Sequence, residues 1–260
     1  MADVAQVAVI GGTGFYDLLG AGSSRHIDTP YGEPSAPVSI GEVGGRQVAF
    51  LPRHGRDHEY PPHLINYRAN LWALASLGVR QVIAPCAVGG LGATVSPGDL
   101  VVPDQLVDRT SGRVQTFVDT GAVHVPFADP YCPGVGAALA AADPAVRQGG
   151  TMVVVDGPRF STRAESQWFA AAGWSLVNMT GHPEAVLARE LRLCYSALAL
   201  VTDLDAGTAT GDGVGQEEVF ALFRANLDRL GALLDRAVAG LPDPEGCRCS
   251  TWADGIELTY

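Results

Sequence analysis

An apolar run over residues 195–200, followed closely by Asp203 and Asp205, constrains the fold of this chain more than any other segment. A continuous apolar run of this length is typical of a buried strand. Residues two apart in a strand point to the same face, so the two aspartates are expected to lie side by side. Two carboxylates at the mouth of a buried strand cost free energy unless a metal, a cation or a proton-sharing ligand compensates them. The pair therefore predicts a functional site at this strand end.

Strands and helices alternate along the chain. Apolar runs predict strands near 7–10, 81–84, 99–102, 151–155, 175–178 and 195–202, and a hairpin over 38–51. Helical patterns predict helices near 63–77, 134–142, 162–172, 183–192 and 216–239. This alternation indicates an α/β fold with a central mixed β-sheet flanked by helices. No linker, repeat or low-complexity tract divides the chain, so residues 1–260 are expected to form a single domain, with a core at about 7–240 and a polar C-terminal tail.

The charge balance excludes several classes of function. The 260 residues carry a net charge of −11, which argues against nucleic acid or an anionic membrane as a general partner. The chain contains no lysine, so chemistry that needs one, such as a Schiff base or a P-loop, is excluded. No apolar run reaches the ~20 residues of a membrane span, and the N-terminus lacks the features of a signal peptide. A cytoplasmic location is expected.

The five cysteines show no paired C-x-x-C spacing, which fits reduced thiols in a cytosol. Cys247 and Cys249 are one residue apart and form a weak candidate for a metal or redox site. Too few further ligands are evident near them in the sequence, so no metal site is expected.

Two segments that follow predicted strands are candidates for anion binding. The first, Gly11–Gly14, offers bare backbone N–H groups at a strand-to-helix junction, and Thr13 adds a hydroxyl donor. It is not a dinucleotide fingerprint, because Asp17 stands where that pattern needs glycine or alanine. The second, 53–58, holds two arginines, which bind oxyanions bidentately, and two histidines, which can orient or deprotonate phosphate. A tight structural turn and a solvated loop are the respective alternatives.

Two later segments join strands to helices. In 157–165, Phe160 is either a core side chain or a surface that stacks on a flat ligand, and the spacing of a capping box shows that part of the signal is helix initiation. In 178–184, Thr180 belongs either to a plain helix cap or to a phosphate site with its hydroxyl as donor. Met179 is a soft surface suited to a sugar or a thioether.

Taken in order, these segments resemble the S-methyl-5'-thioadenosine phosphorylases, a family of the purine nucleoside phosphorylase superfamily. The resemblance runs from about Val7 to near Ala239. Each matching segment alone is only modestly specific for the family, but the ordered set is highly specific. Its carriers are GGTGF at 11–15, RHGRDH at 53–58, PGDLVVPDQLVDRT at 97–110, HVPFADPYC at 124–132, GPRFSTRAES at 157–166, NMT at 178–180 and TDLDAG at 202–207. The fold that it implies is a purine nucleoside phosphorylase-like α/β domain.

The resemblance also implies roles for individual residues. The phosphate-binding set that it implies is Thr13, Arg53, His54, Cys86, Ala87 and Thr180. The nucleoside-binding set is Met179 at the ribose, Phe160 near the base, Asp203 and Asp205 on the purine, and His124, which reaches the 5' pocket of a neighbouring subunit. Selectivity for the 5' substituent is expected from Ser161 and Gln216. Cys86 stands where the human-type pattern has threonine, and because a thiol is a weak donor, the backbone N–H of Ala87 is the stronger candidate there.

The implied reaction is phosphorolysis of 5'-methylthioadenosine to adenine and 5-methylthioribose 1-phosphate, with inorganic phosphate as co-substrate and no cofactor. Asp203 is expected to supply or share a proton at N7 of the departing purine, which requires a pKa raised above ~3.9 by burial and by Asp205. A carboxylate also accepts a hydrogen bond from a 6-amino group, which favours adenine. The expected assembly is a homotrimer or a dimer of trimers.

Three alternatives stay open from the sequence. A phosphorylase of 6-oxopurine nucleosides or of 5'-methylthioinosine shares the same fold and phosphate site. A relative that acts on other 5'-deoxy-5'-substituted adenosines differs only around the 5' position. The most distant alternative is an NAD- or nucleotide-binding protein that uses the glycine-rich turn.

Overall fold

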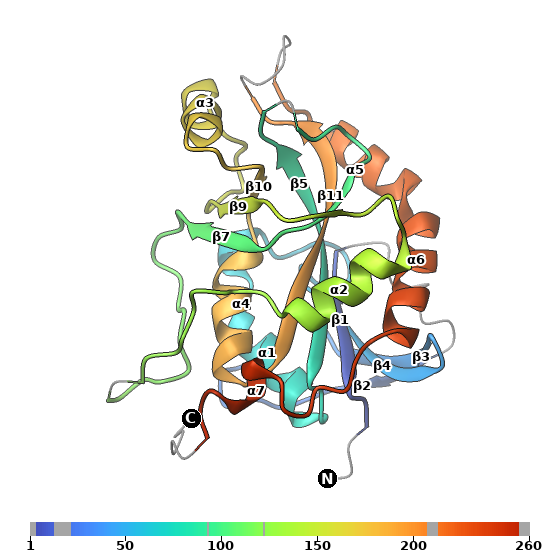
Figure 1. The fold of residues 1–260 in the computed structure, drawn as a ribbon. Coiled ribbons are helices and arrows are strands. Elements are labelled where there is room, and N and C mark those ends of the chain that lie inside the picture. The colour runs from blue at the N-terminus through green and yellow to red at the C-terminus, as the bar shows by residue number, and fades with distance from the viewer. Residues whose placement is uncertain (1–3, 13–21, 93, 122, 207–212, 255–260) are drawn as a thin grey trace.

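The computed structural model describes residues 4–12, 22–92, 94–121, 123–206 and 213–254. Within these ranges the chain forms one α/β domain, in which eleven strands join a single mixed sheet with helices on both faces (Figure 1). The strands are β1 (Val7–Gly11), β2 (Ser23–Arg25), β3 (Val38–Val43), β4 (Arg46–Pro52), β5 (Gln81–Gly90), β6 (Leu100–Val102), β7 (Gln105–Asp108), β8 (Arg147–Gln148), β9 (Thr151–Val154), β10 (Leu176–Asn178) and β11 (Cys194–Leu204). The helices are α1 (Tyr67–Ser76), α2 (Pro133–Ala142), α3 (Arg163–Ala171), α4 (Gly181–Glu190), α5 (Gln216–Ala225), α6 (Leu227–Ala239) and α7 (Arg248–Thr251), with a 3-10 turn at Pro62–Leu64. In the described ranges, no helix combines the length and the apolar character needed to cross a bilayer.

Strand β5 is the centre of the sheet. β1 and β11 both run parallel to it, and β4 pairs with β1, also in parallel. At the last two residues of β5, Gly89 and Gly90, the antiparallel strand β10 takes the place of β1, and β9 and β7 continue from there. Because both β10 and β11 pair with the end of β5, their carboxyl ends come close to the same residues of that strand (Figure 1).

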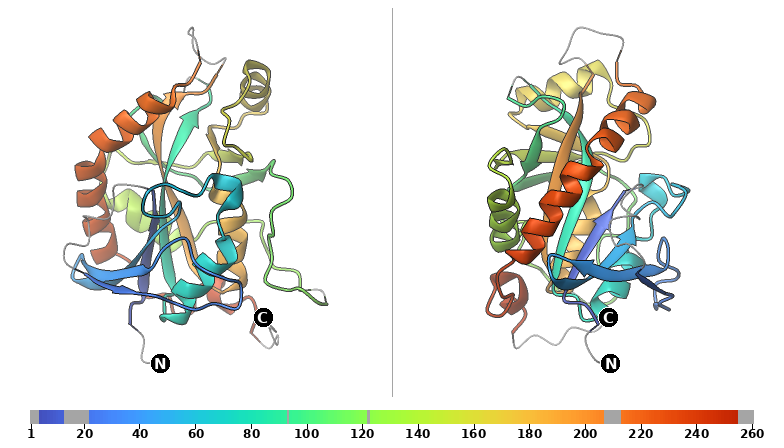
Figure 2. Two further views of the ribbon diagram at one scale, coloured as in Figure 1. Left: turned by 180° about the vertical axis from the view of Figure 1, so that it is seen from behind. Right: turned by 90° about the vertical axis from the view of Figure 1, so that its right-hand side faces the viewer.

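Different helices cover the two faces of the sheet. On one face α1 and α4 pack together, and Leu71 of α1 and Leu187 of α4 join the core formed with β5 and β11. On the other face α2 packs against α6, and Leu139 of α2 and Leu233 of α6 are buried; α6 lies along this face in red in Figure 2. Apolar strand runs are buried from both sides as a result, and in β11 no residue from 195 to 201 is more than 2% exposed.

The strands and helices predicted from the sequence are present, with differences in extent. β5 continues past the predicted end at residue 84 to Gly90. The helix predicted over 216–239 is broken at Asn226, whose side-chain amide donates to the carbonyl of Leu222 at 2.9 Å. The strands that were not predicted, β2, β7 and β8, are short and at least partly exposed, so they leave no apolar pattern. The core also extends beyond the predicted boundary near 240, since Cys249 of α7 is 3% exposed.

Candidate active site

A cavity of about 370 Å³ opens at the carboxyl ends of β1, β4, β5, β10 and β11, with α5 along one side. A cavity of this size suits a small organic ligand. It brings together most of the residues singled out in the sequence. Those that line it are Arg53, His54, Cys86, Ala87, Phe160, Ser161, Met179, Thr180, Asp203, Asp205 and Gln216.

Two expected site residues are not placed at this cavity. Thr13 lies outside the described residues. His124 is exposed, in an irregular segment between β7 and α2, and does not belong to the lining of its own chain's cavity. The role expected for His124 at the 5' pocket of a neighbouring subunit stays a prediction.

A β-bulge sets the direction of the two aspartates. β11 and β5 pair residue for residue up to Val201, but the next residue of β11 to pair is Asp203, opposite Gly89. Thr202 is therefore an extra residue in β11. A Cβ atom on Gly89 would lie 3.1 Å from Asp203 Oδ1 and 3.2 Å from the Cβ of Asp205. Asp203 and Asp205 thus share one face, as the strand pattern predicts, and the missing side chain at Gly89 leaves room for both.

The two carboxyl groups have different surroundings. Asp203 is partly buried and accepts a hydrogen bond from the hydroxyl of Thr202 at 2.8 Å. Burial raises the pKa of Asp203 to about 6; the Thr202 hydrogen bond opposes this rise, and the Asp205 and Glu218 carboxylates add to it. Asp205 is 2% exposed and accepts from the hydroxyl of Ser166 in α3 at 2.5 Å. Near neutral pH Asp203 can exchange a proton, while Asp205 is oriented by a fixed donor.

Arg53 is largely bonded to the protein itself. Its Nε and Nη2 atoms donate to the two oxygens of Glu184, at 2.7 and 2.8 Å, and neither side chain is more than 2% exposed. Nη2 also donates to the carbonyl of Ile10 at 3.0 Å, and Nη1 to that of Pro85 at 3.2 Å. Counted over the described residues, these bonds use four of the five guanidinium N–H groups. The bidentate edge of Arg53 faces Glu184, so a phosphate can receive one Nη1 N–H rather than a bidentate pair.

His54 is a neutral hydrogen-bond acceptor toward the cavity. Its Nδ1 atom lies 2.9 Å from the carbonyl oxygen of Tyr60, so Nδ1 carries the proton and Nε2 keeps its lone pair. Burial, and then the charge of Arg53, lower the pKa of His54 to about 3. The ring also stacks on His58, with 4.3 Å between centroids. His54 can therefore accept a hydrogen bond from a protonated oxyanion, but it brings no positive charge.

Asn178 organises the turn from β10 into α4. Its side-chain oxygen accepts from the N–H groups of Thr180 and Gly181, at 2.8 and 2.7 Å, and its amide donates to the carbonyl of Ala87 at 3.2 Å. This turn holds Thr180 against the cavity, ahead of the regular part of α4, which begins after the extended backbone of His182. Cys86 is a neutral thiol beside it, because burial raises its pKa to about 12.

Several residues that shape the site were not predicted from the sequence. Glu184 is fully buried but begins a helix, where an acidic residue is ordinary, and its partner Arg53 lies 131 positions away. Ser166 is also fully buried, and only its place one turn after a helix cap marks it. Arg113 donates to the carbonyls of Met179 and Asp156, at 2.9 and 2.8 Å, and so ties together two segments beside the cavity. No local pattern signals these long-range partners.

The cysteines are arranged differently from the sequence-based expectation. Cys132, Cys194, Cys247 and Cys249 lie together, with all four sulfur atoms within 4.8 Å of one another. The expectation that Cys247 and Cys249 have too few companions for a metal site is therefore wrong. Cys194 is the first residue of β11, so this cluster lies at the opposite end of that strand from Asp203.

Comparisons with known proteins agree with the fold. The phosphorylase superfamily model matches residues 6–239. A Mycobacterium tuberculosis protein named S-methyl-5'-thioadenosine phosphorylase is 58% identical over 255 residues, covering 98% of this chain and 96% of the relative. A Streptomyces coelicolor protein named purine nucleoside phosphorylase is 56% identical over 270 residues, covering 97% and 96%. The solved structure of methylthioadenosine phosphorylase from Schistosoma mansoni in complex with adenine matches with a TM-score of 0.87 at 38% identity, over 92% of this chain and 93% of that chain. The chain belongs to the phosphorylase superfamily and, within it, to the family of the S-methyl-5'-thioadenosine phosphorylases.

Proposed function

We propose that this protein catalyses phosphorolysis of the N-glycosidic bond of 5'-methylthioadenosine, releasing adenine and 5-methylthioribose 1-phosphate, a reaction of purine and methionine salvage. The observation that carries the proposal is the carboxyl pair of Asp203 and Asp205 on one face of the cavity, with the pKa of Asp203 raised to about 6. The name of the Mycobacterium tuberculosis relative and the adenine bound in the Schistosoma mansoni structure support it.

Asp203 and Asp205 serve the departing base. With a pKa of about 6, roughly one tenth of Asp203 is protonated at pH 7, and a general acid works best with a pKa near the operating pH. Asp203 delivers this proton to N7 as the glycosidic bond breaks, so adenine leaves as a neutral molecule. The carboxylate left behind, with Asp205 held by Ser166, accepts from the 6-amino group. Phe160 packs near the base and Met179 against the ribose.

Phosphate binds to a part of the site that carries little net positive charge. It accepts from the Thr180 hydroxyl, from the backbone N–H of Ala87, from Thr13 and from the remaining Nη1 N–H of Arg53, and its protonated oxygen donates a hydrogen bond to Nε2 of His54. Because Glu184 already neutralises the charge of Arg53, the phosphate does not have to form an ion pair with the guanidinium. Its charge instead stabilises the cationic C1' that develops in the transition state. The neutral Cys86 thiol contributes only a weak donor.

The 5' end of the nucleoside and the assembly are linked in this proposal. Ser161 and Gln216 line the cavity and select the 5' substituent. His124 is exposed in its own subunit and completes the 5' pocket of a neighbour, which requires a homotrimer or a dimer of trimers. Since Asp203 supplies the proton and phosphate is the nucleophile, the reaction uses no cofactor. The proposed location is the cytoplasm.

An ultraviolet assay of free base release tests the proposal across methylthioadenosine, adenosine, inosine and methylthioinosine, each with and without phosphate. Phosphate-dependent release of adenine, fastest from methylthioadenosine, is expected. Preferential hypoxanthine release would assign a 6-oxopurine phosphorylase, and release without phosphate would assign a hydrolase; either result overturns the proposal. Asp203→Asn is expected to lower turnover at least ~100-fold, since it removes the general acid. Near-wild-type turnover in that variant contradicts the role of Asp203.

A further inference from the structure

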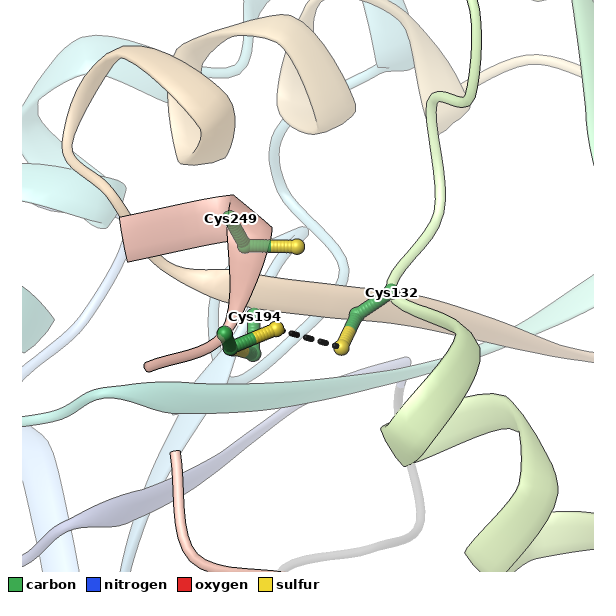
Figure 3. A group of neighbouring side chains, drawn as sticks. Cys132, Cys194 and Cys249 are labelled. Carbon is green, nitrogen blue, oxygen red and sulfur yellow. Dashed lines mark hydrogen bonds between the residues drawn. The ribbon is translucent and has the colours of Figure 1, made fainter. Parts of the chain in front are cut away.

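The four-cysteine cluster at the base of the sheet joins three segments that are distant in sequence. Cys132 precedes α2, Cys194 begins β11, and Cys247 and Cys249 lie at the start of α7. Figure 3 shows the side chains of Cys132, Cys194 and Cys249 converging from these three elements. Cys132, Cys194 and Cys249 are at most 3% exposed, and Cys247 is partly exposed, so the cluster is buried with one accessible member.

The spacing of the sulfur atoms fits one tetrahedral ion. Zinc–thiolate bonds of about 2.3 Å place neighbouring sulfur atoms of a tetrahedral site about 3.8 Å apart. The Sγ atoms of Cys132 and Cys247 are 3.8 Å apart, and every other pair in the cluster lies within 4.8 Å. A disulfide brings two sulfur atoms to about 2.05 Å and uses only one pair. An iron–sulfur cluster needs room for several irons between its cysteines.

Hydrogen-bond donors surround the sulfur of Cys132. The Cys194 and Cys249 thiols donate to the sulfur of Cys132, and the backbone N–H groups of Val135 and Gly134 in the first turn of α2 donate to it as well. N–H groups directed at a ligand sulfur are the outer contacts that stabilise metal-bound thiolates.

A buried cation next to the cluster supplies part of the charge balance. The side chain of Arg189 is buried, and its guanidinium donates to the backbone carbonyls of Pro126 and Asp129, at 2.9 and 2.7 Å. These acceptors are uncharged, so neither bond neutralises the positive charge of Arg189. The guanidinium is close enough to Cys249 to interact with it electrostatically. Four thiolates around a divalent ion carry two negative charges, which Arg189 partly offsets.

We propose that Cys132, Cys194, Cys247 and Cys249 bind one zinc ion in a structural tetrathiolate site. Four thiolates select a soft ion, and tetrahedral sulfur ligation is typical of zinc. With all four positions filled by protein, no open position is left for a substrate. The site is independent of the proposed phosphorolysis, because nine residues of extended strand, about 30 Å, separate Cys194 from Asp203.

The ion fastens the C-terminal segment to the domain. In the described structure this segment is also held by the indole N–H of Trp252, which donates to the carbonyl of Arg189, and by Arg192, which donates to the carbonyl of Ala253, both at 2.9 Å. A zinc ion adds bonds from the same segment to α2 and to β11. Its binding energy therefore adds to the folding energy of the domain.

Metal analysis of the whole chain tests the proposal. The protein is purified with any affinity tag removed, in metal-depleted buffer with a phosphine reductant, and its zinc is counted by elemental mass spectrometry. One zinc ion per chain is expected, with loss of zinc in Cys132→Ser and Cys249→Ser. Cys86→Ser is the matched control, because Cys86 is a buried cysteine outside the cluster, and this variant is expected to keep its zinc. Exchange of zinc for cobalt is expected to give the visible absorption of a tetrahedral thiolate complex.

A second measurement separates a structural site from a catalytic one. Removing zinc with a strong chelator is expected to lower the thermal midpoint while turnover measured well below that midpoint is unchanged. Reduced protein without bound zinc, or zinc retained in both cluster variants, overturns the proposal. Freshly purified protein in which the four thiols are consumed in two disulfides overturns it as well. If the variants fail to fold, the zinc content and the cobalt spectrum of the native chain still test the proposal.

Discussion

The carboxyl group of Asp203 is ionised at neutral pH at a cost to the unliganded fold, so Asp203→Asn is expected to stabilise the free protein. Burial raises the pKa of Asp203 from its ordinary 3.8 to about 6. Since one pKa unit corresponds to about 1.4 kcal/mol, this difference sets a ceiling of about 3 kcal/mol on the gain. Asp203 is only partly buried, and solvent screening reduces the expected gain to about 1–2 kcal/mol. For a chain of this size that raises the thermal midpoint by about 3–6 °C.

The sign of the effect fixes its pH dependence. The folded protein binds the Asp203 proton more tightly than the unfolded chain, because its folded pKa is the higher one. The stabilising contribution of the protonated group is complete below pH about 4 and is lost as pH rises through about 6; above that, the ionised carboxyl leaves the fold less stable than a neutral side chain would. Asparagine carries no charge at any of these pH values. The difference in midpoint between variant and wild type should therefore be largest at pH 8 and close to zero at pH 4.

Thermal unfolding followed by circular dichroism at both pH values, without nucleoside or phosphate, measures this difference. Asp28→Asn is the control, because the Asp28 side chain is 96% exposed and its removal should give no comparable pH-dependent gain. A gain in Asp203→Asn that is equal at pH 4 and pH 8, or a loss of stability at pH 8, refutes the assignment of a raised pKa. The expected combination is a more stable protein that has lost its turnover.

Three further outcomes follow from the geometry. Glu184→Gln leaves the buried Arg53 without its counter-charge and is expected to cost about 3–5 kcal/mol, read from chemical denaturation; an unchanged midpoint contradicts a structural ion pair. Gly89→Ala places a methyl group 3.1 Å from Asp203 Oδ1 and is expected to raise the nucleoside KM at least ~10-fold, so an unchanged KM contradicts the close approach. With its pKa lowered to about 3, His54 stays neutral over the working range. The phosphate KM, corrected for the ionisation of phosphate itself, should therefore not change with pH between 5 and 8. A change in this range that is absent from His54→Gln would contradict a neutral His54.

The fold was predictable because its strands are buried on both faces. An apolar run such as 195–202 is visible without any knowledge of its neighbours, and the alternation with helices then indicates the class. The edge strands β2 and β8 were not predictable in this way, since their side chains are exposed and their pairing depends on the strands beside them. The same holds for the break at Asn226, where one side-chain hydrogen bond ends a pattern that otherwise continues.

The site was predictable in its residue types and less so in its electrostatics. A raised pKa at Asp203 was expected from burial and a second carboxylate nearby, and the structure has both causes. The pairing of Arg53 with Glu184 was not evident, because the two residues are 131 positions apart. The grouping of Cys132 with Cys247 is of the same kind, with 115 positions between them. Long-range contacts of this kind carry no local periodicity, so a single sequence does not reveal them.

The single extra residue in β11, Thr202, determines which side of the sheet the carboxyl groups of Asp203 and Asp205 face. Before the bulge, Val201 faces the side on which a Cβ at Gly90 would meet it at 3.2 Å, and Leu204 returns to that same side at 3.3 Å. In an unbroken strand Asp203 would follow Val201 onto that apolar side. If Thr202 paired in the ladder, both carboxylates would turn to the apolar side, whereas deleting Thr202 would leave Asp203 opposite Gly89 as it is now. The bulge at Thr202 is therefore as much a determinant of the chemistry as the aspartates themselves.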